Sequence, residues 1–241
     1  MKLVQCWDDG VTTDVRLAEL LRRHDAKASF NLNAGLYQAR RSRGWVHQGT
    51  EVWRLGWNEM RDVYRGFTIA NHSLTHCCLD QIPIEQARQD IVQGCERLQQ
   101  FFGQAVPGFV YPFGAFNDAV AGAVREAGHV YARTTGQAGH RDAPAEAMAW
   151  QPDCHFMAPD FWARFERART RGVFHFWGHS YEMVSEAQWD ALDTMLARLN
   201  RVPGAQWGDV ADAVSAARLE DAQLPVQRGL VGDEEKGRPV R

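Results

Sequence analysis

The sequence contains no long hydrophobic run. No segment of its 241 residues approaches the 18 consecutive apolar residues that a membrane-spanning helix needs. The N-terminus also lacks a basic stretch followed by an apolar one, which is the pattern of a signal peptide. From the chain as written we therefore expect a cytoplasmic protein, or a secreted one if a leader has been removed.

The sequence has few cysteines and a small net charge. The five cysteines include no CxxC pair, which argues against a structural zinc site of the cysteine type and favours buried, reduced thiols. The net charge is −3, with acids and bases interspersed along the chain. Nothing in this pattern predicts binding to nucleic acid or to an anionic membrane. The 45% hydrophobic fraction is enough for the core of one large domain.

Strand-like and helix-like patterns alternate along most of the chain. The expected strands are 2–7, 28–33, 67–71, 108–112, 129–134 and 172–178, and the expected helices are 15–24, 57–66, 84–103, 116–128 and 185–199. This alternation predicts an α/β domain with a largely parallel sheet and helices outside it. We expect one domain over 1–218 and a flexible, charged tail over 219–241.

Two adjacent carboxylates, Asp8 and Asp9, stand where the first expected strand runs into a loop at Gly10. Successive strand residues point in different directions, so the two side chains should diverge. One acid could cap the following helix while the other is solvated. A functional interpretation needs partners at the ends of other strands, because the chemistry of parallel α/β folds gathers there.

Histidines supply such partners. His72 and His76 follow the strand 67–71 in "NHSLTH", four residues apart, and on a helical turn that spacing places two imidazoles on one face. His179 follows the strand 172–178. Two histidines and one carboxylate form a common catalytic zinc site, and the same ligands can hold another divalent transition metal. The second Asp would act as a base and His179 as an acid, which indicates metal-assisted hydrolysis.

In this motif order the sequence resembles the polysaccharide deacetylases with a NodB homology domain, carbohydrate esterase family 4, over roughly residues 3–215. "CWDDG" resembles the TFDDG motif, which implies Asp8 as general base and Asp9 as a metal ligand. "NHSLTH" resembles HSxxH, which implies His72 and His76 as the other ligands. "FWGH" resembles the final motif, which implies His179 as general acid.

The resemblance also implies a fold, a cofactor and a substrate. The fold would be a single-domain, distorted (β/α)7 barrel. The cofactor would be one divalent transition metal ion, zinc in the first place and cobalt or nickel as alternatives. The reaction would remove N- or O-linked acetyl groups from a carbohydrate, with a metal-bound water as nucleophile. "VYPFG" resembles the third motif, which implies that the backbone amide of Tyr111 stabilises the oxyanion.

The match is imperfect in two motifs. Val110 stands where many members carry an Arg that pairs with the catalytic Asp, so another group must orient the base. The fourth motif is not evident, and "WQPDCHF" at 150–156 is the nearest segment, so Asp153 or Glu182 could orient His179. His155 could line the site or could simply be half-buried. The candidate substrate-binding residues are Trp150, Trp177, Pro112, Asp153 and Glu182, the two tryptophans as rings that stack on a sugar unless they belong to the core.

Two other functions fit the same residues. A hydrolase of a non-sugar amide or cyclic ureide, similar to an allantoinase, would keep the fold, and the missing Arg at position 110 favours it. A carbohydrate-binding relative without turnover is the second alternative, and the intact base, ligands and acid count against it. The shape of the loop at 36–56 is not predicted.

Overall fold

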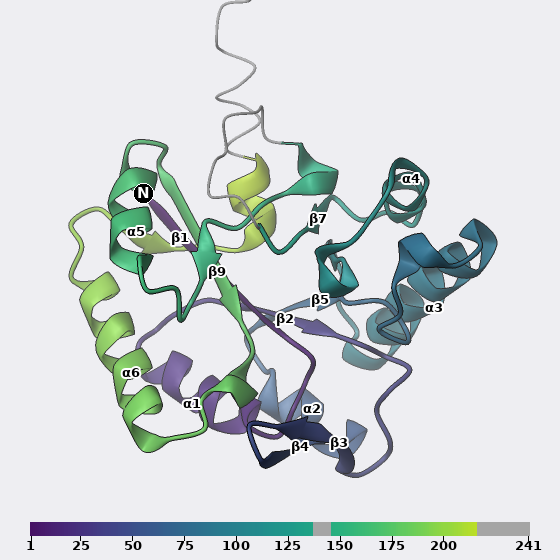
Figure 1. Ribbon diagram of the computed structural model, residues 1–241, viewed down its shortest axis with the longest axis horizontal. Coiled ribbons are helices and arrows are strands. Elements are labelled where there is room, and N and C mark those ends of the chain that lie inside the picture. The colour runs from purple at the N-terminus through teal and green to yellow at the C-terminus, as the bar shows by residue number, and fades with distance from the viewer. Residues whose placement is uncertain (137–145, 216–241) are drawn as a thin grey trace, which may run out of the picture.

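Parallel strands form one curled sheet in the computed structural model, which describes residues 1–136 and 146–215 (Figure 1). Along the sheet the order is β7-β6-β5-β2-β1-β9-β8, and β10 pairs with the start of β1. The strands of this sheet are β1 (Lys2–Asp8), β2 (Ser29–Leu32), β5 (Thr68–Asn71), β6 (Gly108–Val110), β7 (Tyr131–Arg133), β8 (Cys154–His155), β9 (Val173–Gly178) and β10 (Gln206–Trp207). The predicted tail 219–241 lies outside the described residues.

The segment around β8 closes the sheet. At its start, Trp150 donates to the carbonyl of Ala132 at 2.9 Å and accepts from Thr134 at 3.0 Å, beside β7. At its end, the amide of Phe156 donates to the carbonyl of Trp177 at 2.8 Å, beside β9. One stretch of chain thus bonds both to β7 and to β9 across the open side of the curled sheet, and the predicted distorted (β/α)7 barrel is confirmed.

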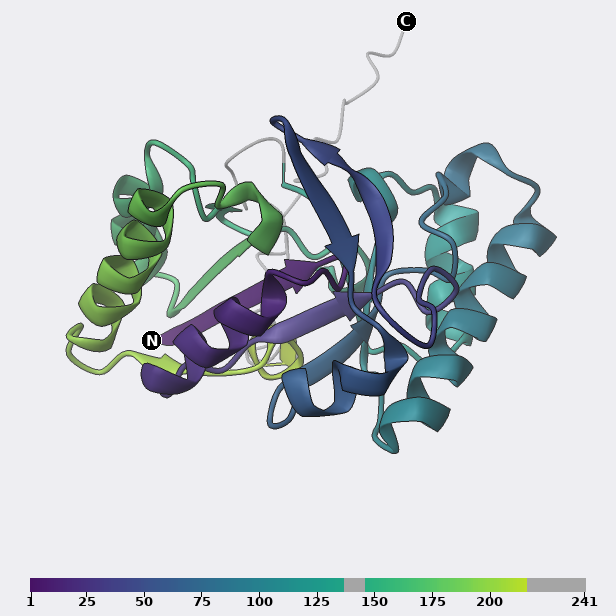
Figure 2. The same ribbon diagram turned by 90° about the horizontal axis from the view of Figure 1, so that it is seen from below.

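Helices pack around the sheet in the alternation that the sequence predicts (Figures 1 and 2). They are α1 (Asp14–Arg23), α2 (Trp57–Val63), α3 (Ile84–Phe102), α4 (Asp118–Glu126), α5 (Phe161–Arg169) and α6 (Glu186–Asn200). In α3 the buried residues Ala87, Ile91 and Leu98 recur at helical spacing, and the helix ends at Gly103, whose φ of 67° is the left-handed conformation of a C-cap. Helix α5 was not predicted.

An antiparallel hairpin replaces the undefined loop expected at 36–56. It consists of β3 (Ser42–His47) and β4 (Thr50–Arg54). Gln48 and Gly49 connect them with φ of 46° and 80°, the positive values of a two-residue hairpin turn. Figure 2 shows the turn of the hairpin projecting from the fold.

Two expectations from composition can be compared with the structure. All five cysteines are unpaired, and Cys6, Cys95 and Cys154 are buried. Within residues 1–136 and 146–215, no helix has both the length and the apolar character needed to cross a membrane.

Candidate active site

A cavity of about 240 Å³ lies where the strands β1, β5, β6 and β9 end. It is lined by Asp8, Asp9, His72, His76, Tyr111, Phe113, Thr135, Trp177, His179 and Tyr181. The lining therefore includes all three predicted metal ligands, the predicted base and the predicted acid.

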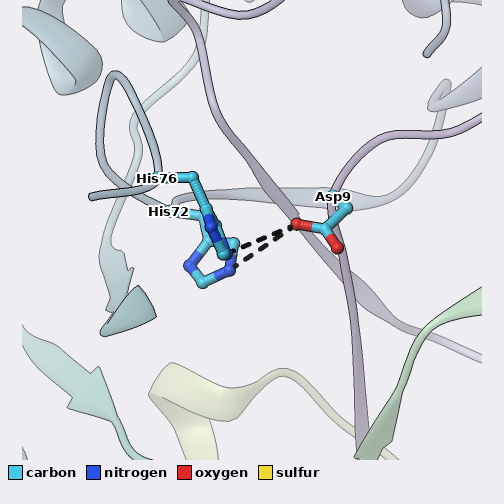
Figure 3. A group of neighbouring side chains, drawn as sticks. All are labelled: Asp9, His72 and His76. Atoms are coloured by element: carbon cyan, nitrogen blue, oxygen red, sulfur yellow. Dashed lines mark ion pairs between the residues drawn. The ribbon is translucent and has the colours of Figure 1, made fainter. Parts of the chain in front are cut away.

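Asp9, His72 and His76 face one another (Figure 3). The carboxylate oxygen Oδ1 of Asp9 lies 3.9 Å from Nε2 of His72 and 3.7 Å from Nε2 of His76. One donor atom from each residue lies within 4.8 Å of the other two. Two imidazoles and a carboxylate converging in this way form the donor set of a catalytic zinc site with open positions.

The tautomer of His72 fits a metal. Its Nδ1 lies 2.8 Å from the carbonyl oxygen of Val110, and because a carbonyl can only accept, Nδ1 carries the proton. The lone pair is then on Nε2, the atom that faces Asp9. Burial lowers the pKa of His72 to about 4, so the ring is neutral near pH 7, as a ligand must be.

The turn that carries the two histidines is not the helical turn that the spacing predicted. Ser73 and His76 have φ of 66° and 57°, in the left-handed region. The Ser73 hydroxyl accepts from the His76 amide at 2.8 Å, and Asp90 of α3 accepts from the amide of Leu74 at 2.7 Å. These bonds hold the turn, and the two rings meet with their centroids 4.7 Å apart. Asp9 also has a left-handed backbone, with φ of 82°.

Asp8 is buried and held at both oxygens. Oδ1 accepts from Nδ2 of Asn31 on β2 at 2.6 Å, and Oδ2 accepts from the guanidinium of Arg133 on β7 at 2.5 Å. Burial alone would raise the pKa of Asp8, but Arg133 and the nearby histidines hold it below its ordinary value. Asp8 is therefore an anion across the physiological range.

Arg133 supplies the guanidinium that the third motif lacks. Val110 of β6 and Arg133 of β7 are paired neighbours in the sheet, so this cation stands one strand away from the position where the resemblance implies an Arg. Arg133 is 1% exposed, and its guanidinium also lies over the ring of Trp177 at 4.7 Å. Sequence reasoning missed this residue because the register that places it beside Val110 is not visible in the sequence.

Glu182, and not Asp153, contacts His179. Oε2 of Glu182 accepts from the backbone amide of His179 at 3.0 Å and lies 3.4 Å from its Nδ1. Asp153 instead accepts from the backbone amide of His175 at 2.7 Å and pairs with Arg171. The proposed orienting role of Asp153 is therefore wrong.

His179 points its other ring nitrogen into the cavity. Nε2 lies 3.8 Å from Oδ2 of Asp9 and 3.9 Å from Oδ2 of Asp8. Burial alone would lower the pKa of His179, but the carboxylates of Glu182, Asp8 and Asp9 raise it above its ordinary value. The ring of Tyr181 lies against that of His179, with centroids 4.9 Å apart.

The amide of Tyr111 is not available to a substrate. It donates to the carbonyl of Arg133 at 3.0 Å as part of the β6–β7 pairing. The prediction that this amide stabilises an oxyanion is therefore wrong. Pro112 has no N–H, so the next amide along the chain is that of Phe113, whose φ of 59° is left-handed and whose side chain is 62% exposed.

Only one of the two candidate tryptophans lines the cavity. Trp177 is half-buried there. Trp150 is buried, with its indole donating to Nδ1 of His175 at 2.8 Å, so it packs in the core and cannot stack on a sugar. Pro112 is also buried and outside the lining set.

A comparison with known protein families matches the part of the chain that carries Asp8, Asp9, His72 and His76. A family profile described as polysaccharide deacetylase matches residues 2–132, more than half of the chain. The chain belongs to the polysaccharide deacetylase family. No curated protein sequence matches it.

Solved structures of polysaccharide deacetylases share the fold. The Streptococcus pyogenes deacetylase PplD in complex with acetate is 19% identical with a TM-score of 0.51, and the match covers 61% of each chain. Wild-type BA3943 of Bacillus anthracis, described as a CE4 family pseudoenzyme, is 15% identical with a TM-score of 0.57, over 88% of this chain and 65% of that one. The Bc1960 peptidoglycan N-acetylglucosamine deacetylase is 14% identical with a TM-score of 0.55, over 88% and 86%.

Proposed function

We propose that this polysaccharide deacetylase family member is a metal-dependent hydrolase that removes N- or O-linked acetyl groups from a carbohydrate. One observation carries the proposal: a single cavity is lined by Asp9, His72 and His76 together with Asp8 and His179. Its volume of about 240 Å³ is below the 300–1,000 Å³ of pockets that enclose drug-sized ligands. An acyl group and its attachment point fit such a cavity, with the rest of a polymer outside.

Asp9, His72 and His76 would hold the metal ion. A divalent ion bound there lowers the pKa of water and polarises the acyl carbonyl. Zinc suits a donor set of two imidazoles and one carboxylate, and cobalt or nickel suits it as well.

Asp8 and His179 would move the protons. The ionised Asp8 carboxylate accepts a proton from the attacking water as the new carbon–oxygen bond forms. Nε2 of His179 then gives a proton to the leaving nitrogen or oxygen as the bond to the acyl carbon breaks and acetate is released. The raised pKa of His179 favours the protonated ring that this step requires.

The amide of Phe113 is the candidate donor to the oxyanion. Phe113 lines the cavity next to His76, with ring centroids 4.7 Å apart. Its amide is the first after Tyr111, whose own amide is used by the sheet, because Pro112 has none. A backbone donor fixed before reaction stabilises a tetrahedral intermediate without reorganisation.

The two alternative functions lose support from the geometry. The missing Arg at position 110 favoured an amide or ureide hydrolase, but Arg133 pairs with the base in its place. A BA3943 mutant is described as a pseudoenzyme with restored enzymatic activity, so inactive chains do occur on this fold. The present chain carries candidates for the base, the ligands and the acid, and they lie together.

Metal content and acetate release, measured on the same preparations, test the proposal. Wild type refilled with one equivalent of zinc should hold the ion and release acetate from an N-acetylated amino-sugar oligomer or an O-acetylated polysaccharide. His76→Ala should lose the ion of this site and the acetate release, because it removes a ligand. Asp8→Asn should keep the metal and lose at least about 100-fold in rate, the typical contribution of a positioned base.

His24→Ala is the matched control. His24 is a half-buried histidine at the end of α1 that pairs with Asp193, outside the cavity. It should leave metal content and rate unchanged. A wild type that still releases acetate after complete removal of the metal would contradict the mechanism.

A further inference from the structure

A second group of metal-binding side chains lies beside the cavity. It consists of His155 on β8, His179 just after β9, and Glu182 in the short turn that follows (Ser180–Glu182). His155 pairs in register with Trp177, two residues before His179, which places both histidines at the same end of the sheet. One donor atom from each of the three residues lies within 4.8 Å of the other two.

The geometry of these contacts differs from that of a hydrogen-bonded network. Oε2 of Glu182 lies 2.8 Å from Nε2 of His155 and 3.4 Å from Nδ1 of His179. Neither ring nitrogen, however, makes a properly directed hydrogen bond to any partner among residues 1–136 and 146–215. The N–H directions of the two rings therefore do not point at Oε2 of Glu182, although both nitrogens lie close to it.

Metal ligands have this arrangement, because they point at a shared centre and not at one another. Zinc binds imidazole nitrogen at about 2.0–2.1 Å and carboxylate oxygen at about 2.0–2.2 Å, so two ligands of a tetrahedral ion stand about 3.3 Å apart. The separations of 2.8 and 3.4 Å in this group lie on either side of that value.

We propose that His155, His179 and Glu182 form a second metal site, of the class that binds zinc, next to the site of Asp9, His72 and His76. The two sites share no ligand. The new one is reachable from solvent, since the side chains of His155, His179 and Glu182 are 26%, 18% and 20% exposed.

Occupation of this site would inhibit the enzyme. A metal ion on Nδ1 of His179 takes the place of the proton there, so the ring cannot form an imidazolium. The proton that stays on Nε2 then belongs to a far weaker acid and is not given to the leaving group. This consequence rests on the proposed function, whereas the binding of the second ion does not. Zinc above one equivalent should therefore slow acetate release by wild type.

Zinc stoichiometry tests the site directly, by equilibrium dialysis of the metal-free full chain against zinc and elemental mass spectrometry. Wild type should bind two equivalents. His155→Gln should bind one and His76→Ala should bind one, while the double variant should bind none. Glu182→Gln provides a second removal of the new site in case His155→Gln does not fold, as judged by its circular dichroism and thermal melting.

The outcomes separate the two proposals. A wild type that binds one equivalent, lost in His76→Ala and kept in His155→Gln, overturns the second site and leaves the proposed function standing. A single equivalent that is lost in His155→Gln and kept in His76→Ala supports the second site. It contradicts the metal site of Asp9, His72 and His76 on which the proposed function depends. In the activity assay, excess zinc should inhibit wild type and not His155→Gln, and equal inhibition of both would refute the inhibitory role.

Discussion

The guanidinium of Arg133 meets the carboxylate of Asp8 at 2.5 Å, although the two residues are 125 positions apart in the sequence. Both side chains are almost fully buried, at 1% and 4% exposed. Arg133 approaches from β7, one strand further along the sheet than the Val110 position of the third motif. Asp8, the proposed base, therefore has a guanidinium partner from β7, while position 110 of β6 carries Val.

Arg133→Met should lower kcat by about 100-fold or more, because the base loses its orientation. Adding Val110→Arg should restore part of the rate, since the neighbouring strand can present a guanidinium to the same carboxylate. Steady-state kinetics of the single and double variants measure this rescue.

A stability measurement is the necessary control for that pair. Removing one partner of a buried ion pair costs about 3–5 kcal/mol in the free energy of unfolding, so chemical denaturation must show that Arg133→Met is folded under assay conditions. A folded Arg133→Met with the wild-type rate would contradict the assigned role. If the double variant with Val110→Arg regains stability but not kcat, the role of Arg133 is structural only.

Phe113→Ala should raise KM by about 5–10-fold, with a smaller effect on kcat. An aromatic side chain that is 62% exposed at the cavity contributes little to the core, and stacking against a ligand is worth about 0.5–1.5 kcal/mol. Val130→Ala is the control, because Val130 is an apolar residue just before β7 that is 52% exposed. This substitution should leave KM unchanged. Equal values of KM for Phe113→Ala and wild type would show that the ring does not contact the substrate.

Tyr181 should position the ring of the acid. Its ring lies between His179, at 4.9 Å, and Trp45 of the hairpin, at 5.0 Å. Tyr181→Phe keeps both ring contacts and should retain the rate, whereas Tyr181→Ala should reduce kcat by about 10–100-fold, the cost of misplacing a catalytic group by about 1 Å. A rate in Tyr181→Phe as low as in Tyr181→Ala would instead assign the effect to the hydroxyl.

Asp14 should make the protein less stable as pH rises from about 4 to 7. Burial raises the pKa of this carboxyl to about 7, despite hydrogen bonds from Ser180, Tyr64 and the amide of Val11. A folded-state pKa above the unfolded value means that the folded state binds the proton more tightly, so the stabilisation is complete below the unfolded pKa and is lost as pH rises through 7.

Urea denaturation of wild type and Asp14→Asn across this range measures the effect. The stability difference between them should change by a few kcal/mol between about pH 4 and 7, in the sense that Asp14→Asn gains relative to wild type as pH rises. A difference that stays constant over this range would show that Asp14 has an ordinary pKa.

The alternation of strands and helices was predictable from the sequence because each element has its own periodicity. The buried positions of α3, for example, recur at helical spacing. The hairpin β3–β4 was not predictable, since "SRGWVHQGTEVWR" mixes polar and aromatic residues and its strands form a sheet separate from the parallel one. The turn at Gln48–Gly49 was the one local signal in that segment.

The residues of the candidate site also fall into those that the sequence predicts and those that only the structure shows. Asp8, Asp9, His72, His76 and His179 were found because they stand in short motifs directly after strands. Arg133 and Glu182 depend on strand register and on the path of a turn, which only the folded chain shows. The assignment of Tyr111 failed for a related reason, because the sequence does not show whether an amide is already used in pairing strands.

The pairing of β1 with β9 also orders events as the chain is synthesised. The three candidate metal ligands are present by residue 76, whereas His179, the proposed acid, follows β9, residues 173–178. Until then one edge of β1 has no partner, although β1 lies inside the finished sheet. An unpaired, apolar strand edge is a site for aggregation during slow, long-range sheet formation. The nascent chain should therefore be most vulnerable to aggregation after residue 76 has been synthesised and before β9 is complete.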